Sequence, residues 1–432
     1  MATAPFFVDY DQHFSSSVKS IRQPALRKSD AYQILPGYIK MGGGFPNPST
    51  FPILEADFTL SDGSSVHIDP KLMAVDLQYG MSEGNSDLRE WLMKFQIKMH
   101  SPPTLRDPKH PGHFDFMLTN GSKEAINLIL QQLLEEGDWA LCEEATYATI
   151  MTMVLPIGAH FEGIKTDDQG IVPDDLERVL STWNTLHPGT KKPRMIFVVT
   201  SAGNPTGVTW SLERKQAVYE IARSHDLLIL EDDAYYYLQF SKPRVPSLLS
   251  MDVDGRVIRF DTLSKIVSPG LRVAMLSGPK PVLSKVRMQK DIGSLHIGGP
   301  TQALLLQLFR HWGQEGFVNH MDKLAEFYKT KAQTAAQYAR KHLADLADWN
   351  PPKGGLFLWI RFHGVKDTGD IVAEALRRGL VVTSGRHFNP SNQDSPYIRV
   401  NYAVASEEEL DKARVNAFRI LAEITRDVTR HS

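Results

Sequence analysis

The chain has 432 residues, 42% of them hydrophobic, and a formal charge of −2 from 48 basic and 50 acidic side chains. This length and composition predict a folded protein with two or three domains' worth of core. A charge so near zero gives no basic surface for nucleic acid, and no apolar stretch is long enough to span a bilayer. We therefore expect neither a nucleic-acid nor a membrane partner.

Cysteine usage narrows the possibilities further. Cys142 is the only cysteine, so an intrachain disulfide is excluded and a cysteine-based metal site is disfavoured. The segment Met1 to Gln12 has no long apolar core and carries Asp9 and Asp11, so neither a secretory signal nor a transit peptide is predicted. We expect a cytoplasmic protein without a metal ion.

In chain order, residues 1–60 come first; they are rich in Pro, Gly and Ser and predict an irregular arm. From about residue 86 to residue 345, short apolar segments alternate with helical ones. This alternation predicts a mainly parallel sheet covered by helices, hence an α/β fold. Strands are predicted at 113–118, 139–143, 194–200, 226–230, 257–260 and 272–276, and helices at 122–135 with Ser122 as N-cap, at 211–224 with Ser211 as cap, and at 322–347.

After residue 345 the pattern changes to a mixture that predicts a smaller α+β domain. The expected strands are 355–362 and 397–402, and the expected helices are 370–378 and 407–425. The predicted organisation is an N-terminal arm with part of the small domain (1–85), a large domain (86–345) and a C-terminal small domain (346–432).

The most informative single residue is Lys265, which follows the apolar strand ending at Phe260. Thr262 and Ser264 precede it, and Arg272 comes seven residues later. A lysine can form an imine with a carbonyl cofactor, while hydroxyls and an arginine can hold a phosphate. An aldehyde that carries a phosphate is pyridoxal 5'-phosphate (PLP). An isolated lysine is more often a surface residue, but this spacing favours a PLP site.

Other polar residues also follow predicted strands, where ligands bind in open α/β sheets. The helix start at Gly121 to Lys123 would offer backbone N–H groups to the phosphate. Asp232 would keep the pyridine nitrogen protonated, Asn204 and Tyr235 would bond the phenolic oxygen of the ring, and Tyr147 would stack on it. Taken singly, each has an ordinary alternative: a helix cap, a charged loop residue, a turn or a packing tyrosine.

Arg399 lies within an otherwise apolar strand of the predicted small domain. A buried arginine is costly unless it is paired. Its planar fork matches the α-carboxylate of an amino acid, and the alternative is a structural ion pair with an internal acid.

Together these residues resemble the fold-type I PLP-dependent aminotransferases, most closely the α-aminoadipate/kynurenine and the fungal-type aromatic amino acid aminotransferases. The resemblance extends from Gly42 to the C-terminal helix, and it implies a mainly parallel seven-stranded sheet between helices plus a smaller α+β domain. The stretches that carry it most specifically are residues 43–48, 77–80, 96–100, 250–256 and 354–360.

The resemblance also implies a role for each matching position. Departures from the family pattern are Lys123-Glu124 in place of two glutamines, Ala234 in place of a proline, and Thr262 in place of a serine. The implied roles are Lys265 as Schiff-base lysine; Asp232 at the pyridine nitrogen; Asn204 and Tyr235 at the phenolic oxygen; Tyr147 on the ring; Ser122, Lys123, Thr262, Ser264 and Arg272 around the phosphate; Arg399 on the α-carboxylate, with Asn204 and Gly44 at the substrate; and Tyr79 reaching the phosphate and substrate of the other subunit of a homodimer.

The function implied is ping-pong transfer of an amino group to 2-oxoglutarate, with amino acids and 2-oxo acids as small-molecule partners. The expected donors are aromatic or long: tyrosine, phenylalanine, tryptophan, kynurenine or 2-aminoadipate. Two alternatives stay open at this point. One is other PLP chemistry, such as β-elimination or decarboxylation. The other is a PLP-sensing regulator, which would need a DNA-binding domain before the aminotransferase-like part. The arm before Gly42 is too short to form such a domain.

Overall fold

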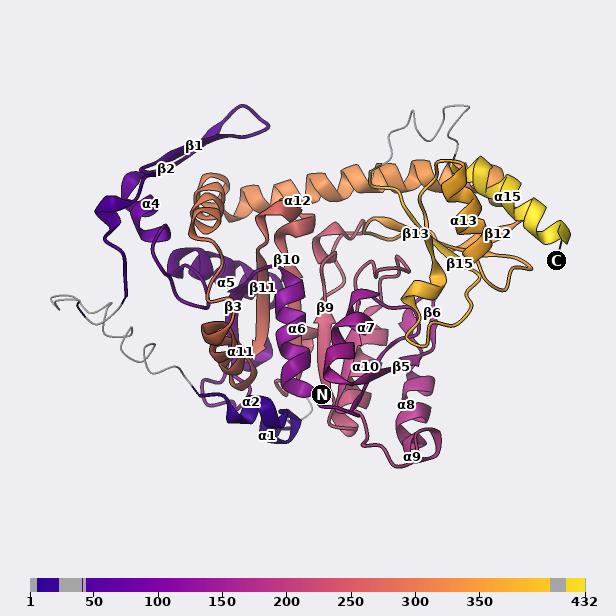
Figure 1. Cartoon of the computed structure of the whole chain (residues 1–432), viewed down its shortest axis with the longest axis horizontal. Coiled ribbons are helices and arrows are strands. Elements are labelled where there is room, and N and C mark those ends of the chain that lie inside the picture. Colours follow the sequence, from indigo (N-terminus) through magenta and orange to yellow (C-terminus); the bar gives the residue numbers. More distant parts are fainter. Residues whose placement is uncertain (1–5, 23–40, 42–43, 405–416, 432) are drawn as a thin grey trace. The chain divides into compact units, whose positions relative to one another are not determined.

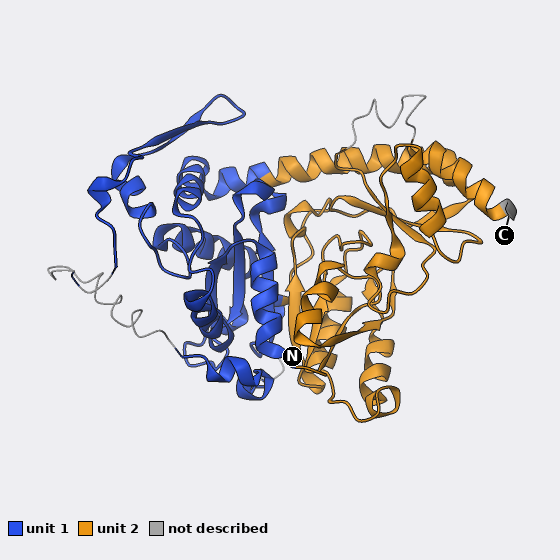
Figure 2. Ribbon diagram, in the orientation of Figure 1, with its two compact units in different colours: residues 1–135, 249–320 blue, residues 136–248, 321–432 orange. Residues whose placement is uncertain are grey.

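The computed structural model describes residues 6–22, 41, 44–404 and 417–431 (Figure 1). These residues form two compact units, each built from two stretches of chain. Unit 1 comprises residues 1–135 and 249–320, and unit 2 comprises residues 136–248 and 321–432 (Figure 2). The units divide the chain at other points than the expected domain boundaries at residues 85 and 345, which stay a prediction.

Unit 1 contains three strands of the main sheet in the order β3, β11, β10. They span Phe114–Thr119, Ala274–Pro279 and Val257–Thr262, and β11 runs antiparallel to both of its neighbours. All six residues of β10 and of β11 are buried. The helices in contact with these strands are α5 (Ser86–His100), α6 (Ser122–Leu133) and α11 (Lys280–Ile292).

The N-terminal part of unit 1 consists of short elements: α1 (Tyr10–His13), α2 (Ser16–Ser20), the hairpin β1 (Ala56–Thr59) and β2 (Ser65–Ile68), and α4 (Pro70–Asp76). Ser15 fixes α2 on α6, because its N–H and its hydroxyl bond the carbonyls of Gln132 (2.6 Å) and Gln131 (2.9 Å).

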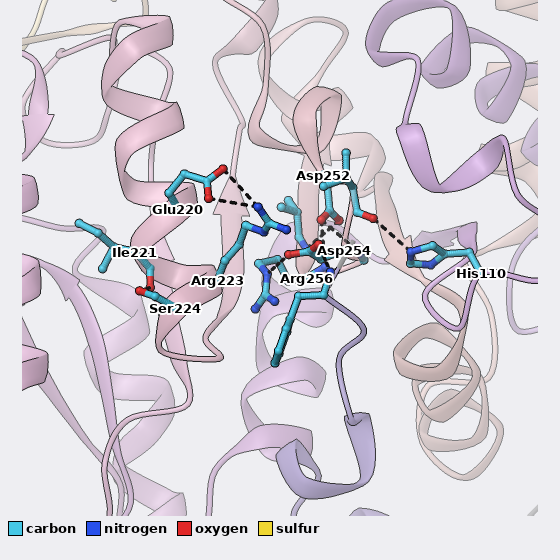
Figure 3. Close-up of polar contacts among 12 residues, drawn as sticks. His110, Glu220, Ile221, Arg223, Ser224, Asp252, Asp254 and Arg256 are labelled. Atoms are coloured by element: carbon cyan, nitrogen blue, oxygen red, sulfur yellow. Dashed lines mark hydrogen bonds and ion pairs between the residues drawn. The ribbon is translucent and has the colours of Figure 1, made fainter. Parts of the chain in front are cut away.

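A buried polar cluster precedes β10 and fixes the start of that strand. The carboxylate of Asp252 accepts the backbone N–H groups of Gly255, Arg256 and Val257 at 3.0 Å each. Arg256 pairs with Asp254 at 3.0 Å, and the His110 imidazole lies 3.1 Å from the Val253 carbonyl (Figure 3). One of the family-like stretches, residues 250–256, is thus a folded turn at the entry to β10.

Unit 2 contains four strands of the main sheet in the order β9, β8, β4, β5. They span Leu228–Asp232, Met195–Val198, Trp139–Glu143 and His160–Ile164, and every neighbouring pair is parallel. The residues of β8 and β9 are all buried, as their apolar sequence predicts. The shorter elements of this part are α7 (Thr149–Val154), β6 (Thr166–Asp167), β7 (Gly170–Ile171), α8 (Pro173–Ser181), α9 (Trp183–Leu186) and α10 (Leu212–Ser224).

Unit 2 also contains an antiparallel sheet in the order β12, β13, β15, β14, which we call the small sheet. Its strands span Ala347–Trp349, Phe357–Phe362, Tyr397–Asn401 and Thr383–Ser384. Helices α13 (Gly369–Arg377) and α15 (Ala417–His431) share one apolar core with it. This confirms the predicted strands and the helix at 370–378; the start of the helix predicted at 407–425 lies outside the described residues.

The predicted α/β class is confirmed, with seven strands divided three and four between the units. Ser122 is not an N-cap. Gly121 takes that position at φ 77°, and no side chain caps α6, so Ser122 is its first residue. The strand predicted at 226–230 begins two residues later because Asp226, at φ 49°, still belongs to the turn after α10. The helix predicted at 322–347 is the second part of α12 (Gly299–Leu343), which breaks at Gly313.

No helix within the described ranges is long and apolar enough to cross a membrane. The same residues contain no group of three or more His, Cys, Asp or Glu side chains suited to a metal ion.

Candidate functional site

Lys265 lies in unit 1 directly after β10. The strand ends at Thr262, and the short 3-10 helix Leu263–Lys265 follows. Thr262 fixes this turn: its Oγ1 accepts the N–H of Ser264 at 3.2 Å and donates to the Ser264 hydroxyl at 3.0 Å. The two hydroxyls predicted to hold a phosphate therefore lie side by side, next to the lysine.

A buried ion pair within strand β10 connects the strand to helix α5. Arg259 lies 3.0 Å from Asp261, and Gln96 of α5 bonds to both, at 2.9 Å and 3.0 Å. These buried groups tie α5 to the strand that carries Lys265. Gln96 belongs to the family-like stretch 96–100, so the structure gives that stretch a supporting role.

Arg272 and the N-terminus of α6 complete a cationic cradle in unit 1. Arg272 has left-handed backbone (φ 55°), and its Nη1 lies 3.5 Å from the Ser264 hydroxyl and 3.1 Å from the Pro269 carbonyl. Its guanidinium packs so closely on Gly121 that a Cβ there would collide with Nη2 and lie 2.8 Å from Cζ. A guanidinium, two hydroxyls and an uncapped helix start suit a phosphate ester.

The remaining unit 1 residues are placed as follows. The Lys123 side chain is exposed, which leaves its backbone N–H at the helix start as the group available to a phosphate. Tyr79 makes ring contacts with Phe45 and His296, at 6.3 Å and 6.5 Å between centroids. Within the described residues, Tyr79 and Gly44 make no polar contact with the side chains around Lys265.

Unit 2 holds the other predicted residues: Asn204, Tyr235 and Tyr147 lie near Arg399, and Asp232 lies near Tyr235. Arg399 lies on β15, and its Nη1 donates to Asn204 Oδ1 at 2.8 Å. Asp232, the last residue of β9, and Tyr235 are both buried. Burial raises the pKa of the Tyr235 hydroxyl, the negative charge of Asp232 raises it further, and the positive charge of Arg399 opposes them. Tyr147 adds a smaller contribution of its own, so these side chains share one electrostatic environment.

Arg399 makes no ion pair within the part of the chain that the structure describes, which argues against the structural-ion-pair alternative. Its guanidinium carbon lies 4.4 Å from the ring centroid of Phe357 and 4.9 Å from that of Phe388. Burial lowers the pKa of Arg399, although the neighbouring tyrosines oppose this. A guanidinium held between two rings, with a neutral amide as its partner, is suited to a carboxylate ligand.

Sequence reasoning missed three residues of unit 2. Phe357 and Phe388 flank Arg399; Phe357 lies in the family-like stretch 354–360, but nothing in the sequence singles out Phe388. The third is Glu143 at the end of β4, whose carboxylate accepts the N–H of Val199 at 3.0 Å. Burial raises the pKa of Glu143 to about 8, and the charge of Asp232 adds to that shift. Its position after an apolar strand was the only available signal.

The fold is of the α/β class, its unit 1 side chains suit a phosphorylated ligand beside a lysine, and the Arg399 guanidinium in unit 2 suits a carboxylate. The chain belongs to the class I and II aminotransferases, whose family model matches residues 76–415. The kynurenine/alpha-aminoadipate aminotransferase of Mus musculus is 37% identical over 394 residues, covering 90% of this chain and 92% of the mouse protein. Aminotransferase tdiD of Emericella nidulans is 33% identical, covering 93% of each.

A solved structure shares the fold. Aminotransferase Aro8 from Candida albicans has a TM-score of 0.86 at 24% identity, over 98% of this chain and 99% of that one. Members of this family depend on PLP, so the enzyme is a PLP-dependent transaminase and the predicted fold type I is confirmed. The two groups of side chains fit the cofactor as far as each unit shows. The roles of the individual residues stay predictions.

Proposed function

We propose that this transaminase moves the amino group of an aromatic or long-chain α-amino acid to 2-oxoglutarate. The observation that carries the proposal is Arg399, a half-buried guanidinium that has an amide partner, two flanking rings and, among the described residues, no acidic partner. Donor and acceptor share one group that such an arginine can bind, the α-carboxylate.

The names of the relatives support the choice of donor. The mouse protein is named for kynurenine and alpha-aminoadipate, and a Dictyostelium discoideum protein that is 30% identical over 90% of this chain is named an aromatic amino acid aminotransferase. Kynurenine is itself aromatic, and aminoadipate is long. Both names therefore fit a broad preference for large side chains.

In this proposal each residue has one task. Bound PLP supplies an electron sink for the charge that develops at Cα of the amino acid. The Lys265 amine removes the Cα proton and later returns it. Asp232 keeps the proton on the pyridine nitrogen, and Arg399 with Asn204 holds the α-carboxylate. Because burial and Asp232 raise the pKa of Tyr235, its hydroxyl keeps its proton and remains a hydrogen-bond donor across the working pH range.

The phosphate is assigned to the residues of unit 1. Arg272 and the hydroxyls of Thr262 and Ser264 would bind its oxygens, together with the backbone N–H groups of Ser122 and Lys123 at the start of α6. Tyr147 would stack on the ring. Tyr79 would act from the second copy of a homodimer, and Gly44 would line the substrate pocket.

We further propose that the enzyme is a cytoplasmic homodimer. Large apolar side chains of unit 1 that are exposed in a single chain support the dimer, and they include Leu54 and Tyr79. A single buried cysteine suits a reducing compartment. The name of the mouse relative places that protein in mitochondria, so fractionation of cells that express the tagged full chain is the deciding measurement for localisation.

The proposed function is tested by the visible absorption of the purified enzyme. Addition of tyrosine or 2-aminoadipate alone should convert the bound cofactor to its amino form, and 2-oxoglutarate should restore the first spectrum. Lys265→Ala should still bind PLP but lose steady-state turnover. A cofactor band that responds to no amino acid would refute the donor assignment, and release of ammonia or carbon dioxide would indicate lyase or decarboxylase chemistry instead.

A further inference from the structure

Unit 2 contains a cavity that the proposed transamination does not use. Its volume is about 550 Å³, within the range of roughly 300–1,000 Å³ that is common for small-molecule sites. Segments from both parts of the unit line it: residues 144–145 after β4, 166–168 around β6, 348–350 at the end of β12, and residues 385, 389 and 394–397 before and at the start of β15.

The cavity lies on the same face of the small sheet as Arg399 but is separate from it. Trp359 and Arg399 are directly opposite each other on β13 and β15, as are Arg361 and Tyr397, so all four side chains point to one face. Trp359, Arg361 and Tyr397 line the cavity, whereas Arg399 does not. The Phe388 ring lies between them, 4.9 Å from the Arg399 guanidinium carbon and edge-on to Trp359 at 5.6 Å.

One wall of the cavity is aromatic. The rings of Trp359 and Tyr397 are stacked, with centroids 4.9 Å apart and planes 6° from parallel, and Trp349 also lines the space. Stacked rings that stay partly exposed offer a flat apolar surface, which favours a ligand that is itself aromatic.

The charges around the cavity call for a ligand with both signs. Five carboxylates line it, but three have cationic or histidine partners: Asp167 with Arg214, Asp348 with His363 and Asp394 with Lys366. Glu144 and Asp168 make no ion pair among the described residues, and one oxygen of Glu144 is bonded by the N–H and the hydroxyl of Thr166.

Arg361 is the single guanidinium among the cavity-lining residues, and it too makes no ion pair in the described part of the chain. Its fork is therefore available to a carboxylate, while Glu144 and Asp168 are available to an ammonium group. A dicarboxylic acid would meet an excess of negative charge here, so this lining disfavours 2-oxoglutarate.

We propose that this cavity is a second amino-acid site, which binds an aromatic α-amino acid as a zwitterion. Arg361 takes the carboxylate, Glu144 and Asp168 take the ammonium group, and the Trp359–Tyr397 wall takes the ring. No bond is made or broken there. The site lies beyond the proposed transamination, and its occupancy does not depend on which amino acid is the donor.

The test measures binding to the full-length, PLP-loaded protein by equilibrium dialysis with radiolabelled L-phenylalanine. Arg399→Ala is the background because it removes the carboxylate partner proposed for the catalytic site. We expect this variant to retain one phenylalanine per chain. Adding Arg361→Ala should weaken the retained binding by about tenfold to a hundredfold, the value of one charge-assisted contact. Adding Arg377→Ala, an exposed arginine of α13, is the matched control and should change nothing.

Analogues and a second variant test the chemical class. Phenethylamine, 3-phenylpropionate and L-alanine each lack one of the three groups, so each should bind at least about tenfold more weakly than L-phenylalanine. Glu144→Gln should weaken L-phenylalanine but not 3-phenylpropionate. The proposal is overturned if Arg399→Ala binds no phenylalanine, if Arg361→Ala binds as well as the control, or if alanine binds as tightly as phenylalanine. Because binding rather than turnover is measured, these outcomes are distinct from failure of the transaminase assay.

Discussion

At the scale of single residues, two buried acids of unit 2 differ in what they contribute. Asp232, the predicted partner of the pyridine nitrogen, ends β9, whereas Glu143 ends β4, which is separated from β9 by β8. Burial raises the pKa of Glu143 to about 8, so near neutral pH this side chain is largely a protonated acid. A protonated Glu143 adds no second negative charge near the Asp232 carboxylate at that pH.

The raised pKa of Glu143 predicts that the stability of the folded state depends on pH, and Glu143→Gln should remove this dependence. Between the ordinary pKa of a glutamate, 4.5, and about 8, the folded state holds a proton that the unfolded state has lost. Stability should therefore fall as pH rises through this window, by roughly 1.4 kcal/mol per pH unit, and level off above it. Glutamine can still accept the Val199 N–H. Its stability advantage over the wild type should thus grow from pH 5.5 to pH 8 in thermal unfolding of the PLP-loaded enzyme.

The control for this prediction is Glu136→Gln, which changes an exposed carboxyl. Other titrating groups are common to all three proteins, so they cancel when the melting temperatures are compared. A constant offset between Glu143→Gln and the wild type at every pH would show that Glu143 carries no buried proton.

Arg399→Lys tests the carboxylate site. Lysine keeps the charge but loses the second hydrogen bond of the fork and the flat contact with Phe357 and Phe388. We expect kcat/KM to fall by about a hundredfold. The KM values of the amino donor and of the oxo acid should both rise, because both substrates carry the α-carboxylate. Arg377→Lys at an exposed site is the control, and a rise in only one KM would exclude a shared carboxylate site.

At the scale of elements, the sequence predicted strand and helix types better than it predicted their ends. Mainly apolar runs such as 139–143 and 257–260 became buried strands, as expected where both faces are covered, and the charged Arg259 in the second run is paired with Asp261. The start of α6 was misassigned: serine is a common N-cap, but here Gly121 takes that position with a positive φ, which a glycine adopts readily. Phe388 could not have been predicted, because only the fold brings the 385–388 turn over Arg399.

The start of α6 gives a prediction of its own. At Gly121 a methyl group would displace the Arg272 guanidinium, so Gly121→Ala should weaken PLP binding by about tenfold or more, as loss of one charge-assisted contact implies. Gly137→Ala is the matched control, because Gly137 has nearly the same φ (79° against 77°) but an added Cβ meets nothing within 4 Å. Apo-enzyme titrated with PLP gives both affinities. Equal affinities in the two variants would separate Arg272 from the phosphate.

At the scale of the whole molecule, the family could be inferred before the fold was known, because its motifs lie at strand ends and are short. The positions of the side chains within each unit could not be inferred from the sequence. Arg399 and Asn204 are far apart in the sequence, and a hydrogen bond between them requires β15 to lie beside the loop after β8. The exposure of the apolar residues of unit 1 could not be predicted from the sequence either. A leucine in a proline-rich arm belongs to no periodic pattern that would indicate whether it faces solvent.

Those exposed residues lead to the prediction for the assembly. Ile53, Leu54 and Tyr79 are 50%, 70% and 58% exposed in the single chain, and a second copy that covers them would bury their apolar surface. We expect a dimer of twice the 48.5 kDa chain mass in sedimentation velocity. Burial of one such aliphatic side chain contributes about 1.5–3 kcal/mol, and a two-fold axis would bury each residue twice. The double change Ile53→Asp with Leu54→Asp should therefore raise the dimer dissociation constant by about a hundredfold or more.

Val381→Asp, at an 81% exposed apolar position in unit 2, is the control and should leave the dimer intact. If the enzyme sediments as a monomer, or if the double variant dimerises like the control, Tyr79 cannot act from a second subunit through this surface.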